Sequence, residues 1–342
     1  MRTSIRTISF KSSNGTDTIN AVVYYPEAVS VRAVALISHG MCDHIDRYRN
    51  FMLYLAHHGI AAFGHDHLGH GKTAAGPERL GYFAPQKGYQ CLVRDLRQLC
   101  SAAGSMFPKT PRFLIGHSMG SLIARLYCLK YPDSISGAVF IGSPGPNPLT
   151  GMGVLLAQQA IRHKGPFSRP DLLEKLTMGS FNRSFVPART EKDWLTRDEE
   201  EVDRALADPL CSFTFTASAF ADLFAMMEIA NSHRWAKEYP QSLPTLLLSG
   251  DCDPVTNFGR GALKVYERLL SAGVSDLHFQ IYQGARHELL NELNREEVYS
   301  DLTEWMQARL PSCGREQPAP EPAEDPQTQE PADGELFPQQ EQ

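Results

Sequence analysis

The sequence predicts an α/β fold in which a mostly parallel, twisted sheet carries helices on both faces. Short apolar runs alternate with longer segments of helical periodicity, and this alternation is typical of β–α–β units. The apolar runs lie at 32–39, 60–64, 113–115, 137–142, 245–249 and 277–282. The helical segments lie at 48–58, 88–106, 261–271 and 295–309. Two further strands, at 2–10 and 19–25, precede this series and are joined by a turn at Ser13-Asn14-Gly15.

The alternation stops between Ser143 and about Leu243, where no segment has a convincing strand pattern. Residues 152–161 and 218–230 have helical periodicity, and Thr196-Arg-Asp-Glu199 has the spacing of a capping box at the start of an acidic helix. An insertion at this position of a parallel sheet lies above the carboxyl ends of the strands. We therefore expect a core formed by residues 1–143 and 244–310, with an inserted helical cap at 144–243.

The composition of the 342-residue chain excludes several classes of protein. Its net charge is −6 and it has no basic patch, so we expect no nucleic-acid partner. The segment before Tyr24 has no continuous apolar run, which argues against a signal peptide and a membrane span. Seven irregularly spaced cysteines favour a reducing compartment, and we expect the cytoplasm. Residues 311–342 are rich in Pro, Glu and Gln, and we expect a disordered tail there.

The segment Phe113–Leu122 has the pattern of a nucleophile elbow, which is a strand, a sharp turn and a helix. The apolar run ends in Gly116-His-Ser-Met-Gly120, and helical periodicity follows. A serine on such a turn projects its Oγ above the sheet, and the flanking glycines leave room where a Cβ would clash. We therefore predict Ser118 as a nucleophile. The alternative is a glycine-rich turn that contains a serine by chance.

A serine hydroxyl is a weak nucleophile, so it needs a general base and an acid that orients this base. On this type of fold the acid and then the histidine follow the serine along the chain. Asp253 and His287 occur in that order, each shortly after an apolar run. We predict Asp253 as the acid and His287 as the base. The alternatives are Asp251 and His278, which we interpret as a turn residue and a strand residue.

A tetrahedral intermediate places a negative charge on oxygen, and two backbone N–H groups typically stabilise it. The residue after the nucleophile, Met119, supplies the first N–H. The second comes from the loop after an early strand of the sheet, where His39-Gly40-Met41 follows an apolar run. We predict the N–H groups of Met41 and Met119 as the oxyanion hole. The alternative for His39-Gly40-Met41 is an ordinary glycine turn.

The histidine-rich run His65-Asp-His-Leu-Gly-His70, with His39 and His44 upstream, suggests a metal centre as a competing hypothesis. However, the run lacks the H-x-x-x-H spacing of a helical site, and no CxxC pair accompanies it. We therefore expect neither a metal ion nor another cofactor. We expect these histidines to hydrogen-bond their loop and line the mouth of the site, with His39 and His117 binding substrate.

One helical face of the predicted cap is apolar and carries Phe220, Leu223, Phe224 and Met227. We predict that Phe220, Phe224 and Met227 bind the apolar part of a substrate. The alternative is that this face packs on the domain beneath it.

Five motifs together resemble the monoacylglycerol lipase and lysophospholipase branch of the α/β-hydrolase superfamily, which is also described as serine aminopeptidase-like. They are Ser38-His-Gly, His65-Asp-His-Leu-Gly-His-Gly71, Gly116-His-Ser-Met-Gly120, Gly250-Asp-Cys-Asp-Pro254 and Gly284-Ala-Arg-His287. The resemblance covers about Arg2 to Leu310. Met41 stands where lipases of this branch often have alanine. The cap resembles those of bacterial lysophospholipase-like hydrolases more than those of mammalian lipases.

The resemblance implies an α/β-hydrolase fold and a cofactor-independent serine hydrolase with Ser118, Asp253 and His287 as its triad. It implies a small acyl ester or lipid, such as a monoacylglycerol or a lysophospholipid, as substrate, and transient contact with a membrane surface is compatible with this. An aminopeptidase or amidase stays open, because the acidic run Glu199–Glu201 is available to hold an ammonium group. An acyltransferase and a non-catalytic binding protein also stay open. The sequence leaves the oligomeric state undetermined.

Overall fold

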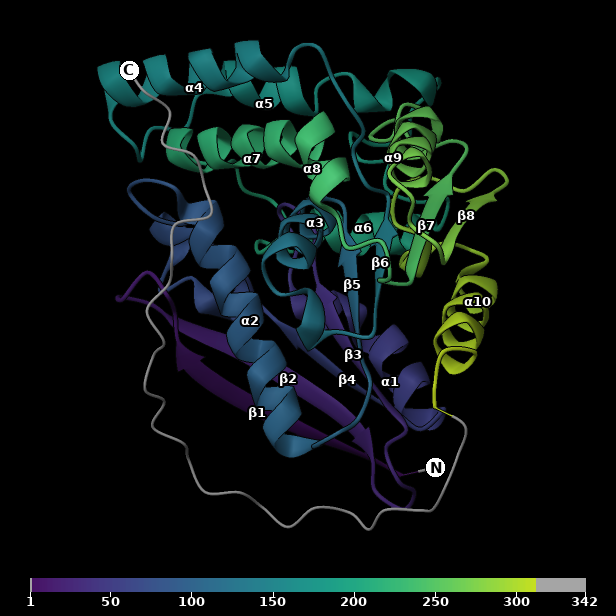
Figure 1. Cartoon of the computed structure of the whole chain (residues 1–342). Helices are drawn as coiled ribbons and strands as arrows, with labels where there is room; N and C mark the ends of the chain where they lie inside the picture. Colours follow the sequence, from purple (N-terminus) through teal and green to yellow (C-terminus); the bar gives the residue numbers. More distant parts are fainter. Residues whose placement is uncertain (1, 312–342) are drawn as a thin grey trace.

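The computed structural model describes residues 2–311, in which eight strands form one twisted sheet (Figure 1). The strand order is β1-β2-β4-β3-β5-β6-β7-β8. Strand β2 is antiparallel to β1 and β4, and the other neighbouring pairs are parallel, which confirms the predicted fold class. The strands are β1 Thr3–Lys11, β2 Thr18–Pro26, β3 Ala33–Ser38, β4 Ile60–His65, β5 Arg112–His117, β6 Gly137–Ile141, β7 Thr245–Gly250 and β8 Leu277–Tyr282.

Helices cover both faces of this sheet and agree with the predicted segments to within a few residues. The helices of the core are α1 Arg49–His57, α2 Gly88–Met106, α3 Met119–Lys130, α9 Arg260–Ser271 and α10 Arg295–Gln307. Short 3₁₀ helices connect several elements: η1 Ile45–Tyr48, η2 Gly71–Thr73, η3 Pro77–Arg79, η4 Pro132–Ser134, η5 Phe181–Ser184 and η6 Leu289–Asn291.

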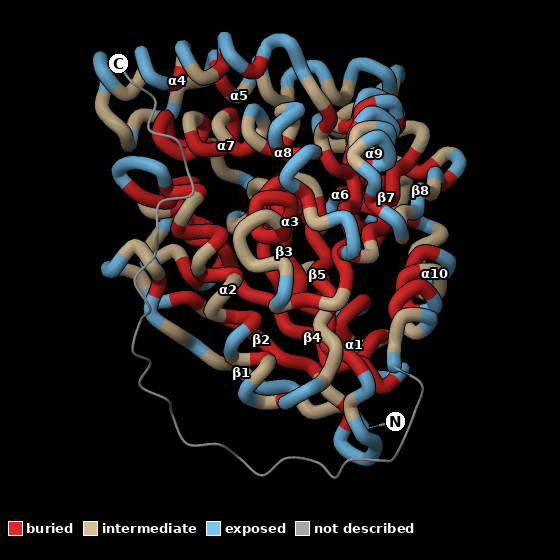
Figure 2. Tube along the Cα trace, viewed as in Figure 1, coloured by how far each residue is buried: buried red, intermediate tan, exposed pale blue. Residues whose placement is uncertain are grey.

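Successive side chains of the central strands point to opposite faces, so the sheet separates two apolar layers. On one face, Leu114 of β5 belongs to the cluster that includes Leu92 of α2 and Leu122 of α3. On the other face, Ile115 belongs to the cluster that includes Phe51 of α1. Figure 2 shows the resulting buried interior between the helices. This two-sided burial explains why the central strands read as continuous apolar runs.

Five helices lie between β6 and β7, and the two longest of them, Thr150–Lys164 and Ala217–Ala230, lie beyond the carboxyl ends of the strands (Figure 1). All five occupy the segment predicted as a cap, and the described chain has no strand there. The helices are α4 Thr150–Lys164, α5 Asp171–Thr177, α6 Glu199–Ala207, α7 Ala217–Ala230 and α8 His233–Glu238.

A buried arginine joins these inserted helices to the core. Arg125 of α3 donates hydrogen bonds to the carbonyl oxygens of Ala230 and Pro144, and its guanidinium lies 4.2 Å from the ring centre of Trp235. In return, the indole N–H of Trp235 donates to the carbonyl oxygen of Arg125 at 3.0 Å. Burial lowers the pKa of Arg125 to about 9, which still leaves the side chain charged at neutral pH.

Helix α6 begins differently from the prediction. The side chain of Asp198 caps it by accepting hydrogen bonds from the N–H groups of Glu200 and Glu201. The hydroxyl of Thr196 instead donates to the carbonyl oxygen of Asn291 at 2.9 Å. The predicted capping box at 196–199 is therefore wrong: Oγ1 of Thr196 accepts from the N–H of Asp198 at 3.1 Å, and the helix begins after Asp198.

No helix within residues 2–311 has the length and apolar character needed to cross a membrane. Residues 312–342, which make up nearly all of the tail predicted to be disordered, lie outside the described residues, as does Met1.

The start of α3 packs against the end of β3 so closely that only glycine fits at Gly120. A Cβ at this position would overlap the carbonyl oxygen of Ser38 and lie 2.5 Å from that of His39. A Cβ on Gly116 would lie 2.5 Å from the carbonyl oxygen of Gly120. Both glycines of the predicted elbow are therefore required by backbone contacts.

We expect Gly120→Ala to lower the free energy of unfolding by about 3 kcal/mol, because backbone atoms cannot move aside for the new methyl group. Urea denaturation measures this change. The matched control is Gly151→Ala in α4, where a new Cβ meets no atom within 4 Å. The control should keep its stability or gain up to about 1 kcal/mol. Equal stability of the two variants would contradict the steric argument.

Candidate active site

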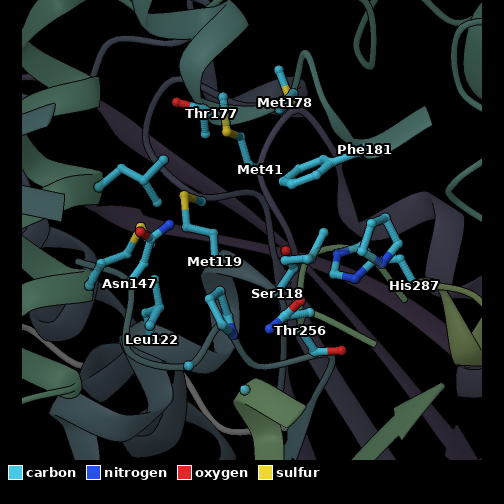
Figure 3. Close-up of a pocket in the computed structure, with 18 of the residues that line it drawn as sticks. Met41, Ser118, Met119, Leu122, Asn147, Thr177, Met178, Phe181, Thr256 and His287 are labelled. Carbon is cyan, nitrogen blue, oxygen red and sulfur yellow. The ribbon is translucent and has the colours of Figure 1, made fainter. Parts of the chain in front are cut away.

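Ser118 occupies the turn between β5 and α3 in a strained backbone conformation, with φ 53° and ψ −119°. Such a conformation costs about 1–3 kcal/mol in a non-glycine residue, so the surroundings must hold it. The N–H of Ser118 donates to the carbonyl oxygen of Ile141 at 2.9 Å. The carbonyl oxygen of Ser118 accepts from the N–H of Ser121 at 2.9 Å and from its hydroxyl at 2.5 Å. The turn places Ser118 at the wall of a cavity (Figure 3).

His287 and Asp253 meet on the loops that follow β8 and β7. The Nδ1 of His287 lies 3.0 Å from Oδ2 of Asp253, and both side chains are buried. The other carboxylate oxygen accepts from the N–H of Val255 at 2.8 Å. Because a carboxylate only accepts, Nδ1 of His287 carries the proton and Nε2 is left as an acceptor. His287 lines the same cavity as Ser118 (Figure 3).

The environment of His287 favours its charged form despite its burial. Burial alone would lower the pKa of His287, but the carboxylate of Asp253 and its hydrogen bond raise this pKa. The carboxylates of Glu288 and Asp43 raise it further, so the pKa lies above its ordinary value. An imidazole in this environment can take up a proton inside a buried site.

The two alternative residues have other contacts. The Oδ1 of Asp251 accepts from the N–H of Gly284 at 2.7 Å, so Asp251 ties the loop after β7 to the loop that carries His287. His278 is exposed on β8, and its Nε2 lies 3.0 Å from Oδ1 of Asp276. Asp253 is therefore the carboxylate that contacts His287.

The loop after β3 passes directly beside the nucleophile candidate. A Cβ on Gly40 would lie 3.4 Å from the Cβ of Ser118. Both Met41, next in this loop, and Met119, the first residue of α3, line the cavity (Figure 3). Neither N–H donates to a backbone carbonyl within residues 2–311. Both remain available to an anionic oxygen at Ser118.

The histidine-rich run forms a buried scaffold behind this loop. The N–H of Cys42 donates to Nε2 of His70 at 3.2 Å, and the N–H of His67 donates to Nε2 of His39 at 3.0 Å. Burial lowers the pKa of His39 to about 4 and the pKa values of His65 and His70 to about 3, so these rings are neutral near pH 7. The hydrogen bonds of His39 and His70 support the loop that carries Met41, whereas the ring nitrogens of His65 have no partner among the described residues.

The assignment of His39 to substrate binding is wrong in this structure. His39 is fully buried, does not line the cavity and is occupied by hydrogen bonds to its own loop and to His67. His117 does line the cavity, and its role in substrate binding stays a prediction.

A single group of potential metal ligands occurs within the described chain, and it contains none of the residues 65–70. It consists of His44, Asp208 and Cys211, whose ligand atoms lie within 4.8 Å of one another. The Nε2 of His44 is hydrogen-bonded to Oδ2 of Asp208 at 2.8 Å, so this pair is accounted for without an ion.

The cavity has a volume of about 470 Å³ and lies between the carboxyl ends of the strands and the inserted helices. Its apolar wall comes mainly from the insertion, which contributes Leu149, Met152, Leu176, Met178, Phe181, Trp194, Leu195, Leu223, Phe224 and Met227. Trp194 stands 5.4 Å from the ring centre of His287 and 5.0 Å from that of Phe181. This aromatic edge shields the imidazole from water.

Helix α7 contributes to the wall in part only. Phe224 and Met227 line the cavity, and their binding of substrate stays a prediction, but Phe220 is fully buried and packs between Phe215 and Phe224. The assignment of Phe220 to substrate binding is therefore wrong, because the first turn of α7 enters the core while its later turns face the cavity.

Several lining residues had no signal in the sequence. Thr177, Phe181 and Trp194 come from 171–195, where neither a motif nor a clear helical period marks them. Leu223 also lines the cavity. Its place on the same apolar face as Phe224 was the signal that could have identified it as a lining residue.

We expect the pKa of His287 to fall below its ordinary value of 6.5 in Asp253→Asn, because burial stays while the charge that offsets it is lost. Titration by NMR with histidine labelled at Cε1 measures it. Asp251→Asn is the matched control, since its side chain contacts Gly284 instead, and it should leave the pKa unchanged. A shift in the control and none in Asp253→Asn would reverse the assignment.

Known proteins are similar to this chain over most of its length. The family model described as "Serine aminopeptidase, S33" matches residues 29–294. The monoacylglycerol lipase of Mycolicibacterium smegmatis is 28% identical over 280 residues, which cover 82% of this chain and 89% of that protein. The human monoglyceride lipase is 28% identical over 302 residues, which cover 86% and 89%.

Among solved structures, a thermostable carboxyl esterase from Bacillus coagulans, in complex with glycerol, has a TM-score of 0.83 and 30% identity. The similarity covers 89% of this chain and 98% of the esterase. The fold, the order of the motifs and the family match agree: the chain belongs to the serine aminopeptidase S33 family of α/β hydrolases.

Proposed function

We propose that this protein is a serine hydrolase that cleaves carboxylic esters of lipids, namely a monoacylglycerol lipase or a lysophospholipase. One observation carries the proposal. Ser118 and His287, which is hydrogen-bonded to buried Asp253, face one largely apolar cavity of about 470 Å³. An acyl chain can occupy such a cavity while its carbonyl carbon lies at the serine.

In the proposed mechanism, Nε2 of His287 takes the proton of Ser118 as Oγ attacks the ester carbonyl carbon. The N–H groups of Met41 and Met119 stabilise the oxyanion that forms. When it collapses, the bond to the alcohol breaks, and His287 returns the proton to this leaving group. Water, activated by the same imidazole, then hydrolyses the acyl-enzyme. Asp253 keeps Nδ1 protonated and stabilises the imidazolium.

The surroundings of the cavity support an ester substrate over an aminoacyl amide. The three glutamates that could hold a substrate ammonium, Glu199–Glu201, do not line the cavity, and the carboxylates that do line it, Asp43 and Glu288, are already paired with Arg47. Glu200 and Glu201 pair with Arg204, and Glu199 lies near Arg189. The relatives named as monoacylglycerol or monoglyceride lipases also support the lipid ester.

The cysteines support a location in the cytoplasm. Residues 2–311 contain six cysteines, and all six are free thiols. Protein thiols stay reduced in that compartment.

We expect Ser118→Ala to lower kcat by at least about 10⁴-fold, because no other group can form the acyl-enzyme. The assay measures product release from monoacylglycerols, lysophospholipids, short aryl esters and aminoacyl amides. The control is Ser105→Ala on the exposed end of α2, which should keep wild-type rates.

Three outcomes of this assay would contradict the proposal. Retained activity of Ser118→Ala would exclude the serine mechanism, and loss of wild-type activity with a chelator would favour a metal. Turnover of aminoacyl amides alone would refute the lipid ester.

We further propose that the outer face of α4 and α5 contacts a lipid surface. This face exposes large apolar side chains beside the cavity: Leu149, Met152, Leu155, Leu172 and Leu176. Leu149, Met152 and Leu176 also line the cavity, so the apolar surface is continuous with its interior. Figure 2 shows the exposed outer edge of these helices. Helix α4 ends with the basic residues Arg162, His163 and Lys164, which suit anionic lipid headgroups.

We expect Leu155→Ser/Leu172→Ser to weaken binding to phosphatidylcholine–phosphatidylglycerol vesicles by about tenfold or more, because two leucines lose their burial in lipid. Vesicle sedimentation measures the binding. Hydrolysis of a water-soluble ester should stay unchanged, since neither residue lines the cavity. Leu270→Ser on α9 removes an equally exposed leucine and should bind like the wild type. Equal binding of both variants would contradict the proposed surface.

A further inference from the structure

A buried ion cluster connects the two loops that flank Ser118. Arg47 in η1 donates from Nη1 and Nη2 to the two carboxylate oxygens of Glu288, at 2.8 and 2.6 Å. Its Nη1 also lies 3.2 Å from Oδ1 of Asp43. Asp43 is two residues beyond Met41, and Glu288 directly follows His287. Arg47 therefore spans from the loop with the proposed oxyanion donor to the loop with the proposed base.

Tyr48 and His117 extend this cluster to the elbow. The hydroxyl of Tyr48 donates to Oδ2 of Asp43 at 2.8 Å and lies 2.9 Å from Nδ1 of His117. The Nε2 of His117 lies 3.3 Å from the carbonyl oxygen of His287. His117 immediately precedes Ser118. The cluster thus joins the three chain segments that carry the proposed nucleophile, oxyanion donor and base.

The side chains of the charged members are nearly inaccessible, with exposed fractions of 10% for Arg47, 5% for Asp43 and 6% for Glu288. Burial alone would raise the pKa values of Asp43 and Glu288, but the guanidinium of Arg47 holds both below their ordinary values. The cluster therefore contains two negative charges and one positive charge. Arg47 is the cation that allows two carboxylates to be buried beside the site.

We propose that Arg47 is a positioning residue, which holds the His287 loop through Glu288 and the Met41 loop through Asp43 in register with Ser118. This role rests on the proposed function, because the relative positions of Ser118, Met41 and His287 affect the rate only if all three act on the same ester group. Because two nitrogens of Arg47 bind the carboxylate of Glu288, the contact fixes the orientation of the His287 loop as well as its distance from Arg47. A displacement of about 1 Å at a catalytic group can lower the rate about 10²-fold.

The excess negative charge of the cluster also acts on the imidazole. The groups that face His287 are Asp253 from the loop after β7, Glu288 from its own loop, Asp43 from the loop after β3 and His117 from the elbow. Removal of the Arg47 charge and removal of the Glu288 charge therefore have opposite effects on the proton affinity of His287. A residue that only stabilised the fold would produce no such pair of opposite effects.

The first experiment separates position from stability. Arg47→Met should lower both the melting temperature and kcat for a soluble aryl ester, because it leaves two buried carboxylates without a cation. The double variant Arg47→Met/Glu288→Leu replaces the pair by apolar groups, so it should regain most of the melting temperature. Its kcat should stay about 100-fold below wild type, with KM close to wild type. Recovery of kcat together with the melting temperature would overturn the proposal.

Two further variants complete this comparison. Arg47→Lys keeps the charge but loses the two-point contact, so its kcat should fall between those of the wild type and Arg47→Met. Arg309→Met is the matched control, because Arg309 also makes a two-point contact with a carboxylate, that of Asp276, far from the cavity. It should lower the melting temperature and leave kcat unchanged. An equal loss of kcat in this control would show that any lost ion pair has this effect.

The second experiment measures the acid limb of kcat/KM against pH, whose midpoint reports the pKa of the free base. Arg47→Met removes a positive charge, so the midpoint should move to higher pH. Glu288→Gln removes a negative charge, so the midpoint should move to lower pH. Midpoints identical to wild type in both variants would overturn the electrostatic part of the proposal.

The same assay distinguishes this inference from the proposed function. If wild-type protein shows no hydrolysis that depends on Ser118, the proposed function fails whatever the Arg47 variants do. If wild-type hydrolysis depends on Ser118 but the double variant is fully active, only the positioning role of Arg47 fails.

Discussion

The contact between the start of α3 and the end of β3 is the constraint on which the rest of the site depends. Gly120 lies against the carbonyl oxygens of Ser38 and His39, which leaves no space for a side chain. This approach forces the sharp turn at Ser118 and places the loop after β3 beside it. Parallel strands end at one edge of the sheet, so Asp253 and His287 reach the same place from β7 and β8.

Buried polar groups then hold the loops at that edge, and they do so in two ways. Behind the loop after β3, the histidines are neutral because burial opposes their protonation, and they act as hydrogen-bond spacers. Between this loop and the His287 loop, charged groups are tolerated because Arg47 pairs with two carboxylates. The same carboxylates favour a protonated His287, so the interactions that order the site also set its acid–base behaviour.

The inserted helices supply most of the cavity wall, and polar contacts at several points attach them to the core. Arg125 ties α3 to the end of α7, and the N–H of Glu288 donates to the carbonyl oxygen of Leu195 at 2.7 Å. The outer side of α4 and α5 exposes several leucines close together. Monomeric soluble proteins rarely expose such a continuous apolar patch. The proposed triad thus lies on loops of the core, whereas most of the apolar cavity wall comes from the inserted segment.

The sequence by itself determined the sheet, the elbow and the order Ser118, Asp253, His287, because local rules govern them: apolar runs make buried strands, and a strained turn needs glycines. It also separated Asp253 from Asp251 correctly as contacts of His287. Only the tertiary structure decided that Asp198 caps α6, that Phe220 and His39 face away from the cavity, and that Arg47 meets Glu288 across 241 positions of the chain. Helical period defines a face but not what covers it, and ion pairs between distant loops leave no periodic trace in a sequence.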